Sequence, residues 1–441
     1  MPSSGAVDLK LSDVAAATGG RLDGPDLQVS GATIDSRSIT PGQLFVPVVA
    51  ERDGHDFVGA ALAAGAAGYL TSRELVGGSA VVVDDTAVAL AHLGRHARDH
   101  LGADAHVVGV TGSVGKTSVK DLLAAALAAR WRTSASVKSF NNELGVPLTL
   151  FNAPEGTEAL VVEMGARDRG HVKALCDLAL PTVGVVTRVA AVHTEVFGTI
   201  DDVAAAKAEL VEALPAHGTA VLNAADPRVA AMAARTRARA LTFGAGGDVH
   251  ADHVTVDDDL RARFTLRSPW GSADVQLNVR GVHMVENALA AGAAALACDV
   301  PVEALPEALA AAELSPWRME VVRLTSGAVL VNDAYNANPT SMAAALQALA
   351  ALPATRRVAV LGVMAEIGAT SDAEHVGIGE LARDLGIEVV SVGVPAYGGV
   401  LVDADDLDAA VAALGPLGEG VAVLVKASRV AELERLAARL T

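Results

Sequence analysis

The sequence has 441 residues, of which 51% are hydrophobic and 3% aromatic, and its 34 basic and 52 acidic residues give a net charge of −18. So acidic a chain is a poor general partner for nucleic acid or an anionic membrane, and it contains no apolar run of the roughly 20 residues that a membrane helix needs. Its length exceeds what a single hydrophobic core usually supports, so we expect about three domains.

The two cysteines, Cys176 and Cys298, lie in apolar stretches without the spacing of a disulfide framework or a metal site. We therefore expect buried thiols in a reducing compartment. The first residues also lack the basic region and apolar core of a secretory signal. These features favour a cytoplasmic enzyme that binds no nucleic acid and does not insert into a membrane.

Residues 1–104 alternate short strand-like and helix-like pieces, with a strand expected within 42–50 and a helix within 58–70. We interpret this region as a small α/β domain. Two polar stretches interrupt it, Asp35-Ser36-Arg37 and residues 51–57. Either could be an ordinary polar turn, but an arginine beside hydroxyl and carboxylate groups could also bind a pyrophosphate or a sugar.

The stretch 106–120 reads HVVGVTGSVGKTSVK. Its apolar start predicts a buried parallel strand, and the apolar spacing after Lys116 predicts a helix. A glycine-rich turn between strand and helix is the layout of a phosphate-binding loop, although the strict pattern has a glycine where this chain has Val110. A purely structural turn would leave the Gly-Lys-Thr run unexplained, so we expect a nucleotide site.

Each residue type in this loop suits a phosphate group. Glycines let backbone N–H groups surround the phosphate oxygens, the lysine supplies a positive charge, and the threonine hydroxyl can hold Mg²⁺ at a helix N-terminus. We expect the phosphates of a nucleotide to be held by Gly112, Ser113, Gly115, Lys116, Thr117 and Ser118.

From 105 to 314 the pattern is strand, helix, strand. Strands expected at 159–163, 183–187 and 220–223 end at Glu163, in a loop with His193, and at Asn223. Ligands in open α/β sheets collect beyond the carboxyl ends of the strands, so these residues are expected to converge with the phosphate loop. Glu163 fits a Mg²⁺ partner better than a surface charge. His193 could be a ligand or a polar loop residue, and Lys207 on a predicted helix would by default be solvated.

A break at residues 315–317 precedes a further set of strands, expected at 329–332, 357–361 and 421–425, with a helix reaching to about Leu352. Each strand leads into a polar loop, which predicts a Rossmann-like third domain with its strand ends facing a ligand. The absence of a GxGxxG run after the first of these strands argues against a dinucleotide.

An ordered set of motifs across nearly the whole chain resembles the Mur ligases of peptidoglycan synthesis. The motifs are TGSVGKTS, NNELGVPLTL, VVEMGA, His193, LNAADP, NDAYNANPTSM, VMAEIG and VKASR. Within the family, the Tyr-Asn-Ala-Asn-Pro motif is most similar to the branch that adds D-alanyl-D-alanine to UDP-N-acetylmuramoyl-tripeptide (UDP-MurNAc-tripeptide). So many ordered motifs are much harder to obtain by chance than one phosphate loop.

The resemblance implies an α/β fold with three domains: an N-terminal UDP-sugar-binding domain (1–104), a central ATP-binding domain with a parallel sheet (105–314) and a Rossmann-like C-terminal domain (315–441) that binds D-Ala-D-Ala and part of ATP. It also implies an ATP-dependent amide ligase, and we expect it to be a monomer. The γ-phosphoryl group would pass to the terminal carboxylate of the tripeptide, and the amine of D-Ala-D-Ala would attack the resulting acyl phosphate. The products would be the UDP-MurNAc-pentapeptide, ADP and phosphate.

The resemblance also implies residue roles. Lys116, His193 and Lys207 would be catalytic, and Thr117, Glu163, His193 and Lys207 would surround two Mg²⁺ ions, with Lys207 present as a carbamate. Asn287, Arg318 and Asp333 would join the loop in binding ATP. Substrate would be bound by Asp35, Ser36, Arg37, Asn141, Asn142, Tyr335, Asn336, Asn338, Glu366, Lys426, Ser428 and Arg429.

Four positions depart from the usual family pattern: Trp317 and Ala427 stand in place of glycines, Met284 in place of an asparagine and Val363 in place of an acid. The alternatives are a related amide ligase, either folylpolyglutamate synthase or the ligase that adds the third residue of the stem peptide. A phosphate-loop ATPase that drives a partner and a non-catalytic nucleotide-binding module are further alternatives. The Asp35-Ser36-Arg37 run argues against the folate enzyme, and residues 335–339 argue against the third-residue ligase.

Overall fold

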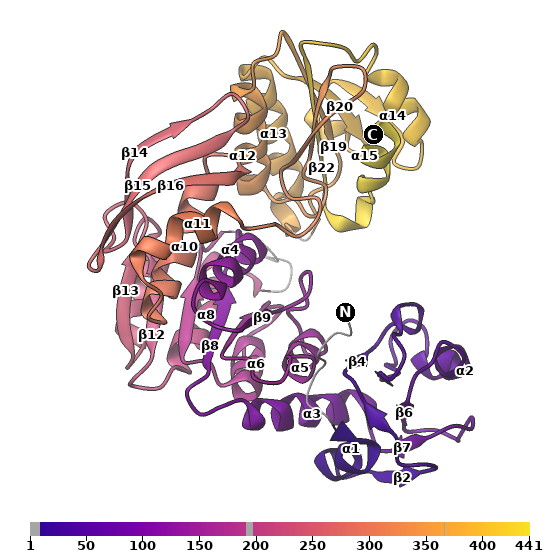
Figure 1. Cartoon of the computed structure of the whole chain (residues 1–441). Coiled ribbons are helices and arrows are strands. Elements are labelled where there is room, and N and C mark those ends of the chain that lie inside the picture. The colour runs from indigo at the N-terminus through magenta and orange to yellow at the C-terminus, as the bar shows by residue number, and fades with distance from the viewer. Residues whose placement is uncertain (1–8, 191–196, 366) are drawn as a thin grey trace.

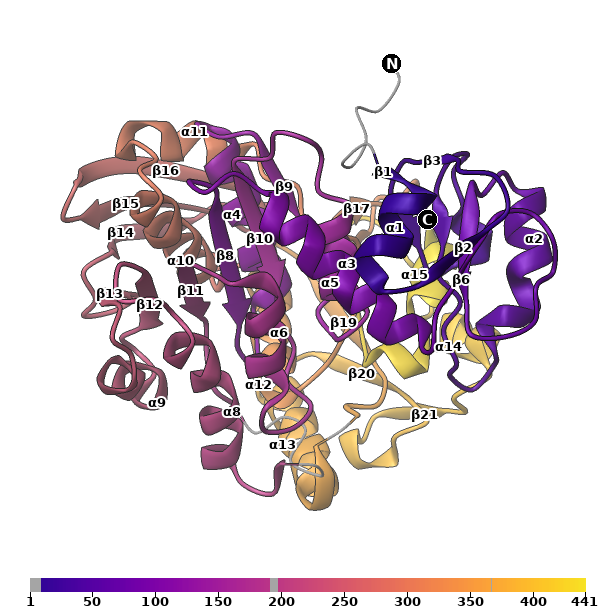
Figure 2. The same cartoon turned by 90° about the horizontal axis from the view of Figure 1, so that it is seen from below.

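The computed structural model describes residues 9–190, 197–365 and 367–441. In Figure 1 the central part of the chain lies on the left, with the N-terminal part at the lower right and the C-terminal part at the upper right. The turned view in Figure 2 shows the same separation of the N-terminal part from the central sheet. The predicted α/β class is confirmed, and the boundaries at residues 104 and 314 stay predictions.

The N-terminal part contains a small mixed sheet. Its elements are β1 (Leu9–Lys10), α1 (Leu11–Thr18), β2 (Arg21–Asp23), β3 (Gln28–Val29), β4 (Ala32–Thr33), η1 (Ser36–Ser38), β5 (Leu44–Phe45), η2 (Gly54–Phe57), α2 (Val58–Ala63), β6 (Gly68–Thr71), β7 (Ala80–Val82) and α3 (Thr86–His100). The strand order is β2-β7-β6-β5-β4, and β4 to β7 are parallel. The strand expected within 42–50 is shorter than predicted, since Pro47 has no N–H to donate to a ladder.

The central part is built on a parallel sheet that carries the phosphate loop. Its first elements are β8 (His106–Thr111), α4 (Lys116–Ala128), β9 (Thr133–Ala135), α5 (Gly145–Phe151), β10 (Ala159–Glu163), α6 (His171–Ala179), β11 (Val183–Val186), α8 (Ile200–Glu212), β12 (Thr219–Asn223), α9 (Pro227–Ala230), η3 (Ala231–Arg235) and β13 (Arg239–Phe243). The strand order is β13-β12-β11-β8-β10-β9. Because β8 pairs with β10, the phosphate loop and Glu163 leave the sheet side by side.

Alternate side chains of β8 pack on opposite faces of this sheet, as expected for a buried parallel strand. Val108 and Val110 belong to the core cluster that includes the inner face of α4. Val107 belongs to the cluster formed with α6 and α8. The sheet is therefore covered by helices on both faces, which fixes the end of β8 and the start of α4.

An antiparallel sheet follows that the sequence reading missed. It consists of β14 (His250–Val256), β15 (Arg261–Ser268) and β16 (Gly271–Arg280), followed by α10 (Met284–Ala297), η4 (Val302–Ala304) and α11 (Leu305–Ala310). Phe264 and Leu266 of β15, and Val275 and Leu277 of β16, join the core beneath α10. The simple strand, helix, strand pattern expected up to residue 314 is therefore wrong for this segment.

The C-terminal part contains a second sheet of mostly parallel strands. Its elements are β17 (Glu320–Arg323), β18 (Val329–Asn332), α12 (Pro339–Ala351), β19 (Arg356–Leu361), η5 (Gly368–Thr370), α13 (Ser371–Asp384), β20 (Glu388–Val392), η6 (Pro395–Tyr397), β21 (Val400–Val402), α14 (Leu407–Ala413), β22 (Val421–Lys426), η7 (Arg429–Ala431) and α15 (Glu434–Leu440). The order is β17-β18-β22-β19-β20-β21, with only β17 antiparallel to its neighbour. The three predicted strands are therefore adjacent, and their carboxyl ends meet.

Two predictions from composition can be compared with this fold. Cys176 and Cys298 are buried free thiols, as predicted, and burial raises the pKa of each to about 12. Among the described helices, none combines the length and the apolar character needed to cross a bilayer.

Candidate active site

A cavity of about 1060 Å³ lies between the carboxyl ends of the central and C-terminal sheets. Residues that follow strands of both sheets form its walls, so the cavity lies between the central and C-terminal parts of the chain. The residues predicted for the site that line it are Ser113, Gly115, Lys116, Thr117, Ser118, Asn141, Asn142, Glu163, Lys207, Asn287, Arg318, Asp333, Tyr335, Asn336, Asn338, Lys426, Ser428 and Arg429.

The phosphate loop has the geometry of an anion cradle. Val110 is a buried residue of β8, so the loop begins only after the strand, and Gly112 is its first glycine. A Cβ on Gly112, which has a φ of +147°, would lie 1.9 Å from the Thr187 hydroxyl. Gly115, with a φ of +86°, precedes the first turn of α4 and leaves its N–H groups available.

Lys116 reaches back over this loop. Its Nζ donates to the Gly112 carbonyl at 2.9 Å. Burial lowers the pKa of Lys116, while the nearby Glu163 carboxylate opposes that shift and Arg318 adds to it. Among the described residues, the half-buried Lys116 ammonium donates only to this carbonyl, so it is suited to an incoming phosphate oxygen.

A buried carboxylate and a hydroxyl face each other beside Lys116. Glu163 is 1% exposed, its Oε2 accepts from the Thr117 hydroxyl at 2.8 Å, and its Oε1 accepts from Asn141 Nδ2 at 2.8 Å. Hard oxygen ligands of this kind, at the N-terminus of a helix that holds phosphate, fit Mg²⁺. Within the described residues, Glu163 is not part of a group of three or more histidine, cysteine, aspartate or glutamate side chains that could hold a metal ion.

Lys207, on α8, has an unusual environment for a lysine. It is 2% exposed, and none of the described carboxylates lies within salt-bridge distance of its Nζ. Burial, together with the positive charge of Lys116, lowers its pKa well below the usual value. The default expectation of a solvated lysine is therefore wrong, because the side chain is buried beside the cavity and its lowered pKa favours the uncharged amine.

Arg318 joins the C-terminal part to the phosphate loop. Its Nη2 donates to the Thr117 hydroxyl at 2.8 Å, and its guanidinium lies 4.1 Å from the centre of the Tyr335 ring. The Tyr335 hydroxyl in turn contacts the hydroxyl of Ser139 from the central part. The two parts therefore touch directly across the cavity.

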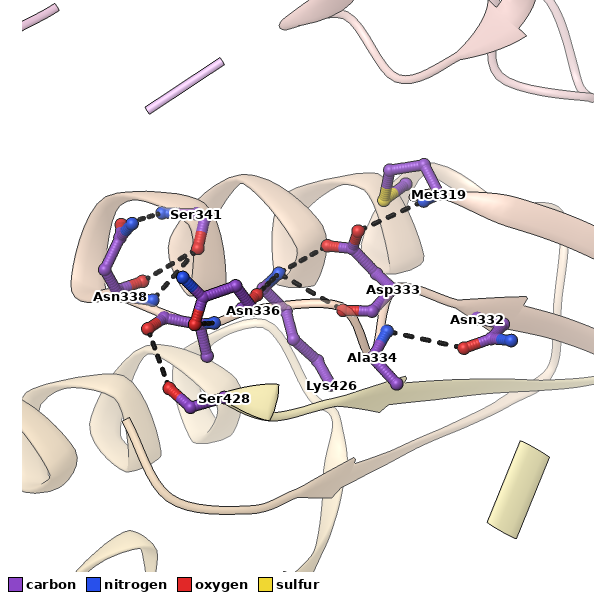
Figure 3. A network of polar contacts seen from close by, with 10 residues as sticks. Met319, Asn332, Asp333, Ala334, Asn336, Asn338, Ser341, Lys426 and Ser428 are labelled. Atoms are coloured by element: carbon purple, nitrogen blue, oxygen red, sulfur yellow. Dashed lines mark hydrogen bonds and ion pairs between the residues drawn. The ribbon is translucent and has the colours of Figure 1, made fainter. Parts of the chain in front are cut away.

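Three C-terminal loops are tied together at one side of the cavity. Figure 3 shows the contacts between the loop after β18 and the residues at the end of β22. Lys426, whose side chain is 2% exposed, forms an ion pair with Asp333 at 2.5 Å and donates to the Asn336 carbonyl at 3.0 Å. Ser428 accepts from Ala365 N at 2.9 Å and donates to the Ala337 carbonyl. Lys426 and Ser428 thus fix the shape of the loops that follow β18 and β19.

Two predicted substrate residues also have a structural task. The Asn338 side chain accepts from Ser341 N at 2.9 Å and begins α12, while Asn142 Oδ1 accepts from Gly145 N at 2.9 Å and begins α5. Both still line the cavity. Their side-chain NH₂ groups form no hydrogen bond with the described part of the chain and are the atoms that can face a ligand.

Some predicted residues lie elsewhere. Asp35, Ser36 and Arg37 belong to the N-terminal part and do not line this cavity, and Asp35 forms an exposed ion pair with Arg37 at 2.9 Å. Gly112 belongs to the phosphate loop but is not one of the residues that line the cavity. His193 and Glu366 fall outside the described residues.

The structure adds a cluster that sequence reasoning missed. Arg188 forms an ion pair with Glu286, with Nη2 at 3.0 and 2.8 Å from the two carboxylate oxygens, and both residues line the cavity. Asn223, expected to line the site, is instead fully buried and donates to Glu286 and to the Thr187 carbonyl. Arg188 and Glu286 are 98 positions apart, so no local pattern could have revealed this pair.

Comparison with known proteins places these features in a family. Residues 110–295 match the Mur ligase middle domain, and residues 317–429 match the domain described as Mur ligase, glutamate ligase domain. A protein of Mycobacterium tuberculosis named UDP-N-acetylmuramoyl-tripeptide--D-alanyl-D-alanine ligase is 40% identical, covering 98% of this chain and 97% of its own length. The protein of the same name from Escherichia coli is 36% identical, with 98% of each chain covered.

Solved structures give the same result for the fold. A crystal structure of MurF from Acinetobacter baumannii superposes with a TM-score of 0.86 at 30% identity over 99% of both chains. MurF ligase from Thermotoga maritima in complex with ADP superposes with a TM-score of 0.80 at 28% identity, covering 93% of this chain and 96% of that one.

Proposed function

The chain belongs to the Mur ligase family, and we propose that it is an ATP-dependent ligase that joins D-alanyl-D-alanine to UDP-MurNAc-tripeptide. The products are the UDP-MurNAc-pentapeptide, a precursor of peptidoglycan, together with ADP and phosphate. The observation that carries this proposal is the single cavity in which a phosphate loop, a buried carboxylate and the loop with the Tyr335-Asn-Ala-Asn-Pro motif meet. Proteins with this ligase name share 36–40% of their residues with the chain over its full length.

The first step is phosphoryl transfer to a carboxylate. A carboxylate oxygen of the tripeptide bonds to the γ-phosphorus of ATP, and the bond to the β-phosphate oxygen breaks to release ADP. Little covalent chemistry is required of the protein, so its contribution is positioning and charge neutralisation. Lys116 and the N–H groups at the start of α4 hold the phosphate oxygens, and Arg318 supplies a further positive charge from the C-terminal side.

Magnesium fits the residues beside the loop, and when bound it neutralises charge on the phosphate oxygens. Thr117 and Glu163 are the groups that would hold the first ion, as a buried hydroxyl and carboxylate in contact. A second ion would use His193, which lies outside the described residues, and a carbamate on Lys207. The uncharged amine of Lys207, which its lowered pKa favours, is the form that reacts with CO₂: its nitrogen would bond to the carbon, one proton would leave, and the neutral amine would become an anionic oxygen ligand.

The second step forms the amide bond. The amine of D-Ala-D-Ala attacks the acyl carbon, and phosphate leaves. We assign the dipeptide to the loops that Lys426 and Ser428 hold together, including Tyr335, Asn336, Asn338 and Arg429, with Glu366 from the adjoining loop. Asn141 and Asn142 would contact the muramyl-peptide, and Asn287 and Asp333 the nucleoside of ATP.

The uridine diphosphate end of the substrate is assigned to the N-terminal part. Asp35, Ser36 and Arg37 lie at η1, where the Asp35 carboxylate accepts from Arg37 N and from its guanidinium. The exposed guanidinium retains donors for a pyrophosphate. A monomeric state and a cytoplasmic location stay predictions.

Coupling between substrates tests the proposed function. ADP release by the purified protein should require ATP, Mg²⁺, UDP-MurNAc-tripeptide and D-Ala-D-Ala together, because the acyl phosphate turns over only when the amine arrives. ADP release is measured by a coupled enzyme assay with each component left out in turn. Rapid ATP hydrolysis with neither peptide present would instead support a phosphate-loop ATPase, and nucleotide binding without any ADP release would support a binding module.

A related ligase is distinguished in the same assay by changing the amine. Diaminopimelate or lysine with UDP-MurNAc-dipeptide tests the third-residue ligase, and glutamate with a folate tests folylpolyglutamate synthase. We expect ADP release with neither pair.

A further inference from the structure

Lys120 is a buried lysine one turn after Lys116 on α4, and the mechanism above does not use it. Its side chain is 3% exposed. The ammonium donates to two backbone carbonyls, Ser136 O at 2.8 Å and Lys138 O at 2.9 Å. It also forms an ion pair with Asp121 Oδ1 at 2.8 Å. Three donors therefore meet three acceptors, so this buried charge is fully satisfied.

The carbonyls that Lys120 holds belong to the segment that carries site residues. Lys138 has a φ of +51°, a conformation that costs energy for a residue with a Cβ. Immediately after it, Ser139 contacts the Tyr335 hydroxyl, and Asn141 donates to Glu163. The Lys120 ammonium thus fixes the left-handed turn from which Ser139 and Asn141 enter the cavity.

Asp121, the ion-pair partner of Lys120, also contacts the segment that leads to the C-terminal part. Its second oxygen, Oδ2, accepts from Ser315 N at 2.7 Å. Ser315 begins the connection between the central and C-terminal parts, three residues before Arg318, which reaches Thr117. One buried ion pair on the phosphate-loop helix therefore holds both the 136–142 segment and the start of the connection to the C-terminal part.

We propose that Lys120 and Asp121 are a positioning pair that couples the start of the connection to the C-terminal part to the acceptor side of the site. Neither residue touches a reacting atom. Asp121 holds Ser315 and orients Lys120. Lys120 holds the turn that presents Asn141 to Glu163 and Ser139 to Tyr335. This inference rests on the proposed function, because it assigns the 136–142 segment to the muramyl-peptide substrate.

If Lys120 and Asp121 position the substrate segment, tripeptide binding should change while nucleotide binding does not. A merely structural role would not separate the two. The phosphate loop has its own contacts, from Lys116 to Gly112 and from Ser113 to Ala190. Lys120→Met should therefore leave the Kd for ADP, measured by calorimetry, within about threefold, while the KM for UDP-MurNAc-tripeptide rises by about tenfold or more, the usual effect of losing hydrogen bonds to a charged group. Lys120→Arg, which keeps the charge, should recover part of the loss.

Asp121→Asn tests the contribution of Asp121 to the pair. An amide has one acceptor oxygen in place of two, so it can keep the contact with either Lys120 or Ser315 but not both. We expect kcat to fall by about 100-fold, because the 136–142 segment would shift and small displacements of groups that position a substrate cost about this much in rate. Lys120→Met combined with Asp121→Asn should be no worse than the more damaging single change, because the two act as one unit.

Lys173→Met is the matched control. Lys173 forms an i,i+4 ion pair with Asp177 with 65% of its side chain exposed, so its loss should leave KM and kcat unchanged. The proposed coupling would be overturned if the effects of Lys120→Met and Asp121→Asn were additive. It would also be overturned if a folded Lys120→Met variant had an unaltered KM for the tripeptide. If Lys120→Met does not fold, as judged by its melting curve, Asp121→Asn alone decides, and unchanged kcat there overturns the proposal. Failure of the unaltered protein to make the amide would instead reject the proposed function.

Discussion

Lys116→Met is expected to lower the rate of ligation about 1,000-fold, the effect typical of losing a charge that stabilises a transferring phosphoryl group. The Lys116 ammonium lies over the Gly112 carbonyl at the start of α4, where the γ-phosphoryl group must pass. Methionine has a similar length and no charge, so the cavity keeps its shape. The rate is measured as ADP release with both peptide substrates saturating.

Measuring ADP binding distinguishes a role of Lys116 in phosphoryl transfer from a role in nucleotide affinity alone. The N–H groups of the loop remain after the substitution, so ADP binding should weaken far less than kcat falls. Lys173→Met again serves as the control for a lysine lost from the surface. A Lys116→Met variant that binds ADP and ligates at the normal rate would remove Lys116 from the transfer step.

Lys207→Ala should lower activity by about 100-fold or more, as expected when a group that holds catalytic charge is removed. If the working form of Lys207 is a carbamate, then short-chain carboxylic acids should restore part of the activity, because a carboxylate can occupy the space left by the side chain. Short alkylamines should not, since they would restore a plain lysine. The same acids should have no effect on Lys116→Met.

The pH dependence of carbamate formation follows from the environment of Lys207. Burial and Lys116 lower its pKa, so the amine is uncharged over a wider pH range than a solvated lysine. As the pH falls through this lowered pKa, the ammonium form appears and cannot react with CO₂. Enzyme depleted of CO₂ should therefore regain activity on addition of bicarbonate, and more slowly at lower pH. Activity that is indifferent to bicarbonate, with no extra carboxyl group on Lys207 in a crystal structure, would contradict the carbamate.

Local patterns were sufficient to predict the elements that carry the nucleotide site. The strands β10 and β18 begin and end where the sequence placed them, at 159–163 and 329–332, because each is a short apolar run ended by a polar residue. The position of Glu163 beside the phosphate loop followed from the same rule, since the ends of parallel strands meet at one edge.

Other features depend on contacts that a sequence pattern does not show. The antiparallel strands β15 and β16 alternate polar and apolar residues, but their partner is the buried face of α10. The Arg188 and Glu286 pair joins the end of β11 to the start of α10. Trp317 occupies a glycine position of the family with a φ of +62° and lies against Arg429, 4.8 Å from the guanidinium carbon to the ring centre. Each arises from tertiary packing.

Met284, which departs from the family pattern, also has a partner in the structure. Asn287 Nδ2 lies 3.4 Å from the Met284 sulfur, and Met284 is 2% exposed and lines the cavity. A thioether is a weak acceptor, so Asn287 keeps most of its hydrogen-bonding capacity for a ligand. The structure offers no explanation for Val363.

The mass of the product formed from ATP, Mg²⁺, D-Ala-D-Ala and UDP-MurNAc-tripeptide tests the proposed function most directly. We predict a single new species whose mass is that of the tripeptide plus the dipeptide less one water, formed in step with ADP. Tripeptides ending in diaminopimelate and in lysine should be compared, because one of them must serve as acceptor. If neither tripeptide gains the dipeptide, the chain is not this ligase. This holds whether ADP is released or the nucleotide only stays bound.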